Sequence, residues 1–351
     1  MRSSWTSSSR DSTLPPRLTP GDRAYALVNG FRATQIVHAA VELGIPDLIA
    51  QGRATVDELS AATGIDRGRL RRLLRALVGL GVLTESDADA YTNTEVGELF
   101  REDVPGSRRP QVRMLVPESY RNWERFMETL RTGVTGQQLA HGATLWELMA
   151  RDPDFGARFN AAMASNTESL AQFVATAGDF RRTALVVDVG GGEGSLVAGI
   201  LRAHAGLHGI VFDLPAGLTQ TNAYLREHQV LDRCTLVEGD FFRSVPAADA
   251  YLLKDILHDW ADGEATAILN VCRRAMNPSA RVMVVERVMP SRVTDSPQHL
   301  NATITDLQMM TQLGGKERTV EEFSALFEAA ELKIDRLTPG GVYQLIEAVA
   351  V

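Results

Sequence analysis

From Thr183 to the end of the chain, short apolar runs alternate with segments of helical periodicity. The strand candidates cover residues 185–189, 209–213, 235–238, 250–253, 281–286, 332–337 and 342–350, and helical patterns such as 196–203 and 264–276 lie between them. The first four runs are apolar enough for strands buried on both faces of a parallel sheet. The alternation predicts a doubly wound, Rossmann-like α/β domain. The turn Thr338-Pro-Gly-Gly341 joins the last two runs as a hairpin, which predicts an antiparallel last strand.

The amino-terminal part of the chain is mostly helical. Thr55 and Asp66 are expected to cap two successive helices, and the second helix carries an apolar stripe at Leu70, Leu73, Leu74 and Leu77. A short β-like segment follows, so the layout predicts a winged-helix-like domain. We therefore expect a disordered leader at 1–20, the winged-helix-like domain at 21–105, a helical connector at 106–180 and the α/β domain at 181–351.

A winged helix also raises the alternative of a DNA-binding regulator. Residues 1–105 contain 12 arginines against 14 carboxylates, and the whole chain has a formal net charge of −8. This balance disfavours a nucleic-acid partner and favours a role of the domain in dimerisation. The absence of a long apolar run argues against a membrane partner. Two cysteines, Cys234 and Cys272, are too few for a disulfide framework, so we expect a cytoplasmic location.

The segment Val186-Val-Asp-Val-Gly-Gly-Gly-Glu-Gly194 places a glycine-rich turn directly after a buried strand. The turn lacks the Gly-Lys-Ser/Thr of a phosphate loop, and its spacing fails the dinucleotide fingerprint because Ser195 occupies the last glycine position. Gly190 and Gly192 let the backbone turn tightly and approach a ligand. Asp188 just before them suits a ligand with ammonium and sulfonium charges better than a diphosphate. S-adenosyl-L-methionine is such a ligand.

Two later strand ends support the same cofactor. Asp213 ends the second strand, 23 residues after Gly190, where it is placed to accept hydrogen bonds from ribose hydroxyls. Asp240 and Phe241 follow the third strand, and they offer an acid for the adenine amino group and a ring for its face. Carboxyl ends of parallel strands meet at one edge of the sheet, so these residues predict one cofactor site.

The fourth strand leads into Leu252-Leu-Lys-Asp-Ile-Leu-His-Asp-Trp260. His258 is the one histidine of seven that follows a core strand at its carboxyl end. A catalytic histidine needs a carboxylate that fixes its tautomer, and Glu286 and Glu317 stand at later strand ends. The segment has too few ligands for zinc, so no metal is expected.

The series VDVGGGEG, FDLP, GDFF, LLKDILHDW, VVER and GGKERT resembles the S-adenosylmethionine-dependent O-methyltransferases of small aromatic molecules. This family includes plant phenolic methyltransferases and bacterial enzymes that tailor antibiotics. The resemblance runs from about residue 22 to the end of the chain. It implies a homodimer formed through the winged-helix-like domain and methyl transfer to a hydroxyl, expected to be phenolic, of a polyketide or other secondary metabolite.

The resemblance also implies roles for individual residues. Gly190 would lie against the methionine end of the cofactor, Asp213 would bind its ribose, and Asp240 with Phe241 would hold its adenine. Lys254 matches a cofactor-contacting lysine and His258 the general base, which Glu286 and Glu317 flank and orient. The acceptor pocket is expected to include Met163, Trp260 and Met309 or Met310.

Two points keep alternatives open. Asp255 is an unexpected charge beside Lys254, and pairing between the two would alter the cofactor contact. Some bacterial relatives with this fold and cofactor perform hydroxylation or other chemistry instead of methyl transfer. Those relatives often replace the histidine base, so the intact His258 favours methyl transfer here.

Overall fold

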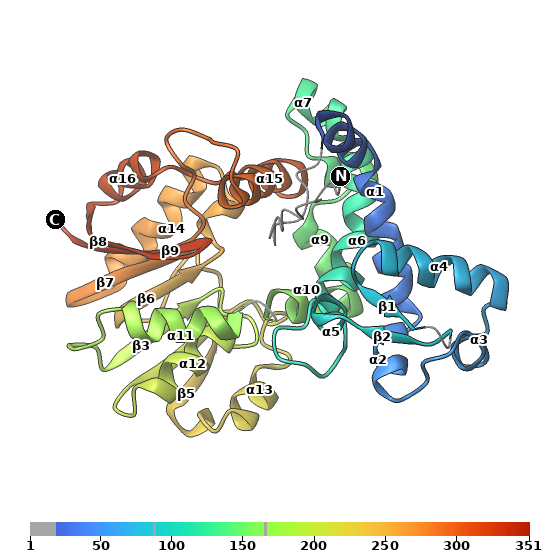
Figure 1. Cartoon of the computed structure of the whole chain (residues 1–351). Helices are drawn as coiled ribbons and strands as arrows, with labels where there is room; N and C mark the ends of the chain where they lie inside the picture. Colours follow the sequence, from blue (N-terminus) through green and yellow to red (C-terminus); the bar gives the residue numbers. More distant parts are fainter. Residues whose placement is uncertain (1–18, 87–88, 165–166) are drawn as a thin grey trace, which may run out of the picture. The chain divides into compact units, whose positions relative to one another are not determined.

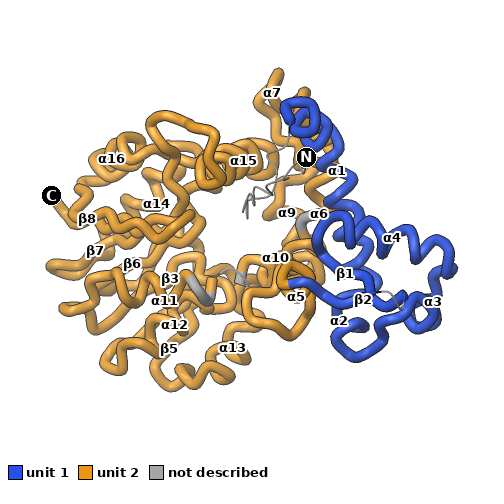
Figure 2. The backbone as a smooth tube through the Cα atoms, in the orientation of Figure 1, with its two compact units in different colours: residues 1–94 blue, residues 95–351 orange. Residues whose placement is uncertain are grey.

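The computed structural model describes residues 19–86, 89–164 and 167–351. The expected leader, residues 1–20, lies outside this range except for Thr19, which caps the first helix, and Pro20, with which that helix begins. The chain forms two compact units, residues 1–94 and 95–351, and each is described by itself (Figure 2). The helical segment 106–180 belongs to the same unit as the α/β part.

The first unit contains four helices and a two-stranded wing among its described residues. The elements are α1 (Pro20–Glu42), α2 (Ile45–Ala50), α3 (Val56–Thr63), α4 (Arg67–Gly79), β1 (Leu83–Glu85) and β2 (Tyr91–Asn93). The two strands pair in antiparallel fashion. The predicted winged-helix-like layout is therefore confirmed.

The predicted caps and apolar stripe explain why these helices form. The side chain of Thr55 accepts a hydrogen bond from the backbone of Glu58, whose carboxylate in turn accepts from the Thr55 backbone. Asp66 caps α4 by accepting a hydrogen bond from the Arg69 backbone. In α4 the side chains of Leu70, Leu74 and Leu77 are fully buried, whereas Leu73 is half-buried.

The second unit begins with a run of helices. They are α5 (Glu95–Glu98), α6 (Arg109–Glu124), α7 (Phe126–Thr132), α8 (Gly136–His141), α9 (Leu145–Arg151), α10 (Pro153–Ala164) and α11 (Thr167–Ala177). Bulky apolar side chains of α6, α9 and α10 form a small core of their own around Met114, Leu145 and Phe155.

A seven-stranded sheet forms the centre of the second unit, with the strand order β5-β4-β3-β6-β7-β9-β8. The strands are β3 (Leu185–Val189), β4 (His208–Asp213), β5 (Cys234–Glu238), β6 (Ala248–Lys254), β7 (Met276–Glu286), β8 (Leu332–Gly340) and β9 (Tyr343–Ala350). The strands β3 to β7 run parallel, and β9 pairs antiparallel with both β7 and β8. The predicted doubly wound sheet with an antiparallel last strand is thus confirmed.

The hairpin of the last two strands differs in detail from the prediction. Thr338, Pro339 and Gly340 continue β8, because their register partners on β9 are Leu345, Gln344 and Tyr343. The turn itself is made by Gly341, which has a positive φ of 80°, and the next residue. The antiparallel strand β9 lies inside the sheet, and β8 forms its edge.

Helices cover both faces of the sheet (Figure 1). The helices that follow the strands are α12 (Ser195–Ala203), α13 (Thr221–Glu227), α14 (Asp262–Ala275), α15 (Pro297–Gln312) and α16 (Val320–Ala329), with 3-10 turns η1 (Leu231–Arg233) and η2 (Leu257–Asp259). One core contains Val187 and Val189 of β3 with residues of α14 and α16, and the other contains Val186 with residues of α11 and α12. The alternation along β3 is that of a strand buried on both faces.

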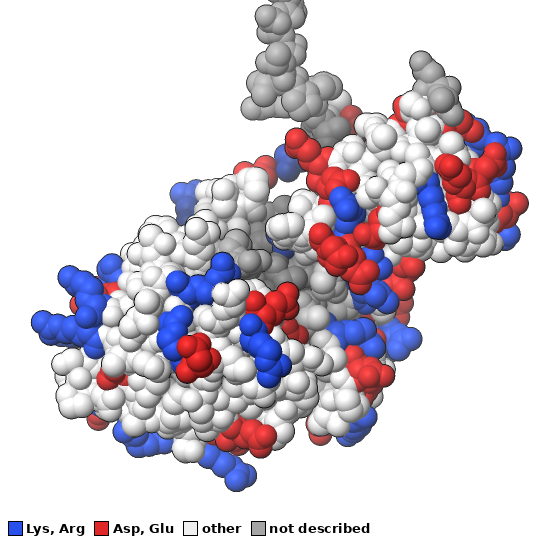
Figure 3. Space-filling view, turned by 90° about the horizontal axis from the view of Figure 1, so that it is seen from below, with Lys and Arg blue, Asp and Glu red and all other residues white. Residues whose placement is uncertain are grey.

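Charged side chains of both signs are intermixed on the face shown in Figure 3. Among the residues that the structure describes, no helix combines the length and apolar character needed to cross a bilayer. Cys234 and Cys272 are buried free thiols.

Candidate active site

The glycine-rich turn follows β3 at the carboxyl edge of the sheet. The backbone N–H of Gly190 donates a hydrogen bond of 2.8 Å to the carbonyl of Phe212, which ties the turn to β4. Gly190 has a φ of 68°, and a Cβ there would lie 2.5 Å from Cδ1 of Ile256. Gly192 also has a positive φ, but a Cβ there would meet no atom within 4 Å. The turn is therefore packed on one side and open on the other, as a backbone that receives a ligand must be.

Asp188 lies beneath this turn and is almost fully buried. Its Oδ2 accepts a hydrogen bond of 3.2 Å from the backbone N–H of Val197 in α12. A Cβ on Gly191 would come within 2.8 Å of the Asp188 carboxyl carbon. Burial raises the pKa of Asp188 to about 7. The structure thus places this carboxyl group where it joins the strand, the turn and the following helix.

Asp213 at the end of β4 also contacts the turn. Its Oδ2 accepts a hydrogen bond of 2.8 Å from the N–H of Gly192, and its Oδ1 accepts one of 2.6 Å from the N–H of Leu214. Burial raises the pKa of this carboxyl group. A carboxylate offers about four acceptor positions, so Asp213 keeps capacity for two hydroxyl donors. This geometry fits the expected ribose contact.

Asp240 and Phe241 follow β5 at the same edge. Asp240 accepts a hydrogen bond of 2.9 Å from the Phe242 backbone, which fixes the local turn. The Cε1 atom of Phe241 lies 3.6 Å from the position that a Cβ on Gly190 would take. The structure therefore brings the Phe241 ring beside the glycine turn, as expected for a ring that packs on a flat ligand.

His258 is held in the turn η2, and its side chain is buried, with 6% of the residue exposed. Its Nδ1 lies 3.0 Å from Oε1 of Glu317, and its Nε2 lies 3.3 Å from Oδ1 of Asp259. Burial alone would lower the pKa of His258, but the carboxylates of Asp259, Glu317 and Asp255 overcome this effect and raise it to about 10. Both ring nitrogens therefore face a carboxylate in this structure.

Glu286, at the end of β7, contacts the backbone of the segment 256–260, which contains η2 and is called the histidine turn below. It does not contact the imidazole ring. Its Oε1 accepts hydrogen bonds from the N–H groups of Ile256 (3.2 Å), Leu257 (2.6 Å) and His258 (3.2 Å). Burial raises the pKa of Glu286 to about 7. Of the two expected partners, Glu317 thus contacts the imidazole ring, and Glu286 fixes the main chain that carries it.

Arg318 is a site residue that sequence reasoning missed. Its fully buried guanidinium donates from Nη1 to the carbonyl of Leu257 and from Nη2 to the carbonyl of Trp260, both at 2.7 Å, and from Nε to Asp262 at 3.0 Å. These bonds satisfy carbonyl groups of the histidine turn. The available signal was its position directly after Glu317 in GGKERT.

Gly315 explains how Glu317 reaches His258. A Cβ on Gly315 would lie 2.0 Å from the carbonyl oxygen of His258. Only glycine permits this approach of two backbone segments. Farther along this segment, the N–H of Glu317 donates a hydrogen bond of 2.9 Å to Asp306 of α15.

Lys254 and Asp255 form an ion pair, the alternative that the sequence left open. The Lys254 Nζ lies 2.7 Å from Oδ2 of Asp255. Asp255 also contacts Arg287 at 3.3 Å and accepts a hydrogen bond of 3.0 Å from the Tyr343 hydroxyl. Although burial raises the pKa of Asp255, the cations Lys254, His258 and Arg287 hold it well below its usual range.

Trp260 belongs to an aromatic cluster beside the site. Its ring stacks on Trp146 of α9 at 6.0 Å and makes edge contacts with Phe241 at 6.2 Å and Phe242 at 4.7 Å. Trp146 also contacts Phe159 of α10. Phe159 and Met163 both pack against the small core around Met114, Leu145 and Phe155. The other two expected acceptor residues lie on α15, where Met309 is buried and Met310 is half-buried.

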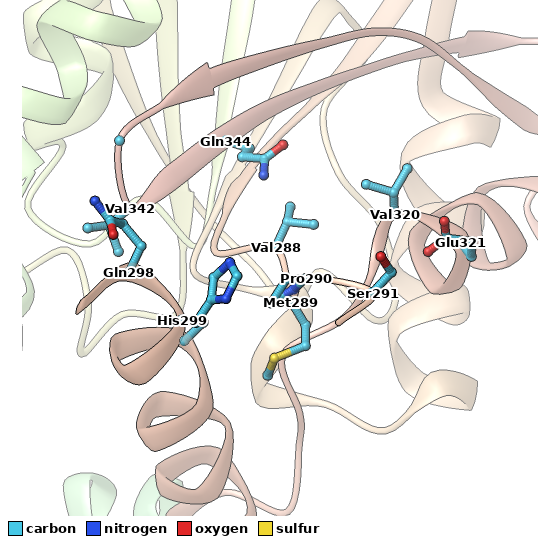
Figure 4. Close-up of a pocket in the computed structure, with 12 residues that line it drawn as sticks. Val288, Met289, Pro290, Ser291, Gln298, His299, Val320, Glu321, Val342 and Gln344 are labelled. Atoms are coloured by element: carbon cyan, nitrogen blue, oxygen red, sulfur yellow. The ribbon is translucent and has the colours of Figure 1, made fainter. Parts of the chain in front are cut away.

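A separate cavity of about 300 Å³ lies near the carboxyl end of β7. It is bordered by His299 of α15, Val320 and Glu321 of α16 and Gln344 of β9 (Figure 4). None of the expected site residues lines it. Within the described part of the chain, no group of three or more His, Cys, Asp and Glu side chains is arranged to hold a metal ion.

Comparisons with known proteins identify the family of this chain. The family model of the O-methyltransferase domain matches residues 123–333, and that of the O-methyltransferase dimerisation domain matches residues 25–103. The phenazine O-methyltransferase PhzM of Lysobacter antibioticus is 36% identical over 314 residues, which cover 89% of this chain and 91% of that protein. The mitomycin biosynthesis 6-O-methyltransferase of Streptomyces lavendulae is 35% identical over 318 residues, 90% of each chain.

A solved structure is also similar over nearly the whole chain. The O-methyltransferase NcsB1 from neocarzinostatin biosynthesis, in complex with S-adenosylmethionine and 2-hydroxy-5-methyl naphthoic acid, has a TM-score of 0.78 and 32% identity. The match covers 91% of this chain and 96% of NcsB1. These findings favour neither a DNA-binding regulator nor a hydroxylase. The chain belongs to the O-methyltransferase family, with the dimerisation domain of that family at its amino-terminal end.

Proposed function

We propose that this enzyme transfers a methyl group from S-adenosylmethionine to a phenolic hydroxyl of an aromatic secondary metabolite, with His258 as the general base. The cofactor supplies an electrophilic methyl group on a positively charged sulfur. The observation that carries the proposal is the buried His258, whose Nδ1 is held by Glu317 at 3.0 Å, at the same edge of the sheet as the glycine turn.

The cofactor residues of this proposal are those that surround the open side of the turn. Asp213 retains free acceptor positions for ribose hydroxyls, and Phe241 offers a ring beside Gly190. Asp188 acts from below, where it supports the turn through Val197. Lys254 contributes as one half of an ion pair, because its ammonium group is already bound to Asp255.

The pKa of His258 suits a phenolic acceptor. A free phenol has a pKa of about 10 and an unperturbed histidine one of about 6.5, a gap of roughly 5 kcal/mol for proton transfer. In the ligand-free structure the carboxylates of Asp259, Glu317 and Asp255 raise the pKa of His258 to about 10. Once an acceptor displaces Asp259 from Nε2, Glu317 and Asp255 still raise the pKa and narrow this gap. The acceptor hydroxyl would take the place of the Asp259 carboxylate at Nε2, which lies at 3.3 Å in this structure.

The aromatic cluster supports a flat acceptor. Trp260 stacks on Trp146 with an angle of 10° between their ring planes. Such rings offer a large apolar surface in a fixed orientation. We propose that Trp260, Met163 and one of Met309 and Met310 form walls of the acceptor pocket, in line with the naphthoic acid bound to NcsB1.

We further propose that the protein is a homodimer. The helix α1 exposes Tyr25, Leu27, Val28 and Phe31, each with more than half of its surface accessible. An apolar set of this kind on one helix is typical of a protein interface. The dimerisation-domain match includes these residues. A monomer in light scattering at micromolar concentration would contradict this proposal.

Product analysis tests the proposed reaction. The protein is incubated with S-adenosylmethionine carrying a ¹³C-labelled methyl group and a panel of hydroxynaphthoates, hydroxyphenazines and phenolic polyketides. The proposal predicts a labelled methoxy carbon in at least one product. A labelled N-methyl carbon, a hydroxylated product or an unconsumed cofactor across the panel would contradict it.

A further inference from the structure

Asp255 has a left-handed backbone conformation, and its carboxylate is buried among two cations and a tyrosine hydroxyl. It directly follows β6 and has a φ of 52°, a left-handed conformation that Asp and Asn tolerate better than other non-glycine residues. Its backbone N–H donates a hydrogen bond of 3.2 Å to the carbonyl of Val285, which extends the pairing of β6 with β7. A residue kept in this conformation at the rim of an active site points to a function.

The carboxylate of Asp255 joins three strands. Oδ2 contacts Nζ of Lys254 from β6 at 2.7 Å and accepts a hydrogen bond of 3.0 Å from the Tyr343 hydroxyl of β9. Oδ1 lies 3.3 Å from Arg287, which follows β7. The Arg287 guanidinium also lies over the Tyr343 ring, 4.4 Å from its centre. Asp255 is therefore the anion between two cations.

This cluster adjoins the chain segment that contacts the cofactor turn and leads to the base. Ile256, the next residue, packs on Gly190, and its backbone N–H is held by Glu286. The strand β6 pairs with β3, and Lys254 is close enough to the buried Asp188 to act on its charge. The side chains of Lys254 and Asp255 are 11% and 14% exposed, so water screens their charges only weakly.

We propose that Asp255 is a positioning residue that neutralises Lys254 beside the cofactor and thereby lets the site distinguish the donor from its product. This inference rests on the proposed position of the cofactor. The donor, S-adenosylmethionine, carries a positive sulfur, whereas S-adenosylhomocysteine, which remains after methyl transfer, carries a neutral thioether. Without the Asp255 charge, Lys254 and Arg287 would repel the donor and leave the binding of the product almost unchanged.

The substitution D255N isolates the charge. Asn has nearly the same shape and adopts the left-handed conformation as readily as Asp, so the backbone at residue 255 is retained. Binding of both ligands is measured by titration calorimetry without acceptor, at one pH and ionic strength. We expect the affinity for S-adenosylmethionine to fall about tenfold or more, with less than a threefold change for S-adenosylhomocysteine. D335N, at an exposed carboxylate of the edge strand β8, serves as the control and leaves both affinities unchanged.

A second pair of variants tests whether Asp255 acts through Lys254. K254M and K254M/D255N are compared for the ratio of the two affinities. Arg287 remains in both variants, but Lys254, the cation beside the cofactor, is gone, so we expect their two ratios to differ by less than those of the wild-type enzyme and D255N. Equal losses for both ligands in D255N, or no loss for either, would overturn the proposal. So would a change of ratio between the two K254M variants as large as that between the wild-type enzyme and D255N. The measurement needs no acceptor, so a failure of the proposed phenolic chemistry does not affect it.

Discussion

The Oε1 atom of Glu317 lies 3.0 Å from Nδ1 of His258, although the two residues are 59 positions apart in the chain. The contact is possible because Gly315 lets the backbone pass against the carbonyl of His258. A carboxylate at Nδ1 keeps the proton on that nitrogen and directs the lone pair of the neutral ring to Nε2. The carboxylate that fixes the tautomer of the proposed base thus comes from a distant part of the chain, and folding brings it to His258.

E317Q should lower kcat about 10–100-fold and leave the Kd of S-adenosylmethionine within about twofold. The amide keeps the shape of the side chain but removes the charge that stabilises a protonated His258. Steady-state rates with saturating cofactor, together with calorimetric binding, check this outcome. E321Q changes an exposed glutamate in the first turn of α16 and is the matched control. Equal rates for E317Q and the wild-type enzyme would refute the assigned role.

The activity should rise with pH through the alkaline range. Asp259 and Glu317 raise the pKa of His258 to about 10, so in the ligand-free enzyme the ring is protonated at neutral pH and accepts no further proton. A plot of kcat/KM against pH should therefore climb above pH 7. D259N removes the charge 3.3 Å from Nε2, so the midpoint of the climb should move to lower pH.

The same acceptor is used for both enzymes in the pH experiment, so the titration of its own hydroxyl contributes equally to both profiles. A midpoint that stays in place or moves to higher pH in D259N would show that Asp259 does not control the base.

R318M should destabilise the second unit. The Arg318 guanidinium is fully buried and donates to the carbonyls of Leu257 and Trp260, so its removal leaves buried acceptors without donors. A loss of about 3 kcal/mol corresponds to a fall in Tm of about 6–12 °C. K316M removes two partly exposed ion pairs, with Asp262 and Glu322, and should change the stability by less than about 1 kcal/mol. Similar Tm values for R318M and K316M in calorimetry would contradict the prediction.

G315A should lower both activity and stability, because the new Cβ would overlap the carbonyl oxygen of His258 at 2.0 Å. The histidine turn has to shift, and the contact with Glu317 is lost with it. G263A is the matched control, since a Cβ there meets no atom within 4 Å and alanine favours the helix α14. We expect kcat to fall at least tenfold in G315A and to stay near the wild-type value in G263A.

The local sequence pattern was sufficient to predict where the strands of this protein lie in the chain. The predicted strand 185–189 coincides with β3, and the other strands differ by up to five residues at either end. Apolar runs and turn residues act over a few positions, so the sequence displays them directly. The position of β9 between β7 and β8 depends instead on pairing between distant segments.

The placement of a candidate site residue was predictable where the residue ends or follows a strand, because topology brings such residues to one edge of the sheet. This holds for Asp213, Phe241 and His258. The partners of buried side chains were not predictable in the same way. Glu286 binds backbone N–H groups instead of the imidazole, and Arg318 closes the histidine turn from inside the protein. Both contacts depend on how two loops pack, and sequence periodicity does not describe that.

The role of His258 as the general base is tested most directly by the methyl-transfer rate of H258A, compared with that of the wild-type enzyme in a single turnover with bound S-adenosylmethionine. If His258 is the general base, the rate of H258A is about 10²–10⁴-fold lower, with the Kd of the cofactor within about twofold of the wild-type value. A wild-type rate in H258A would contradict the assignment of His258 as the base.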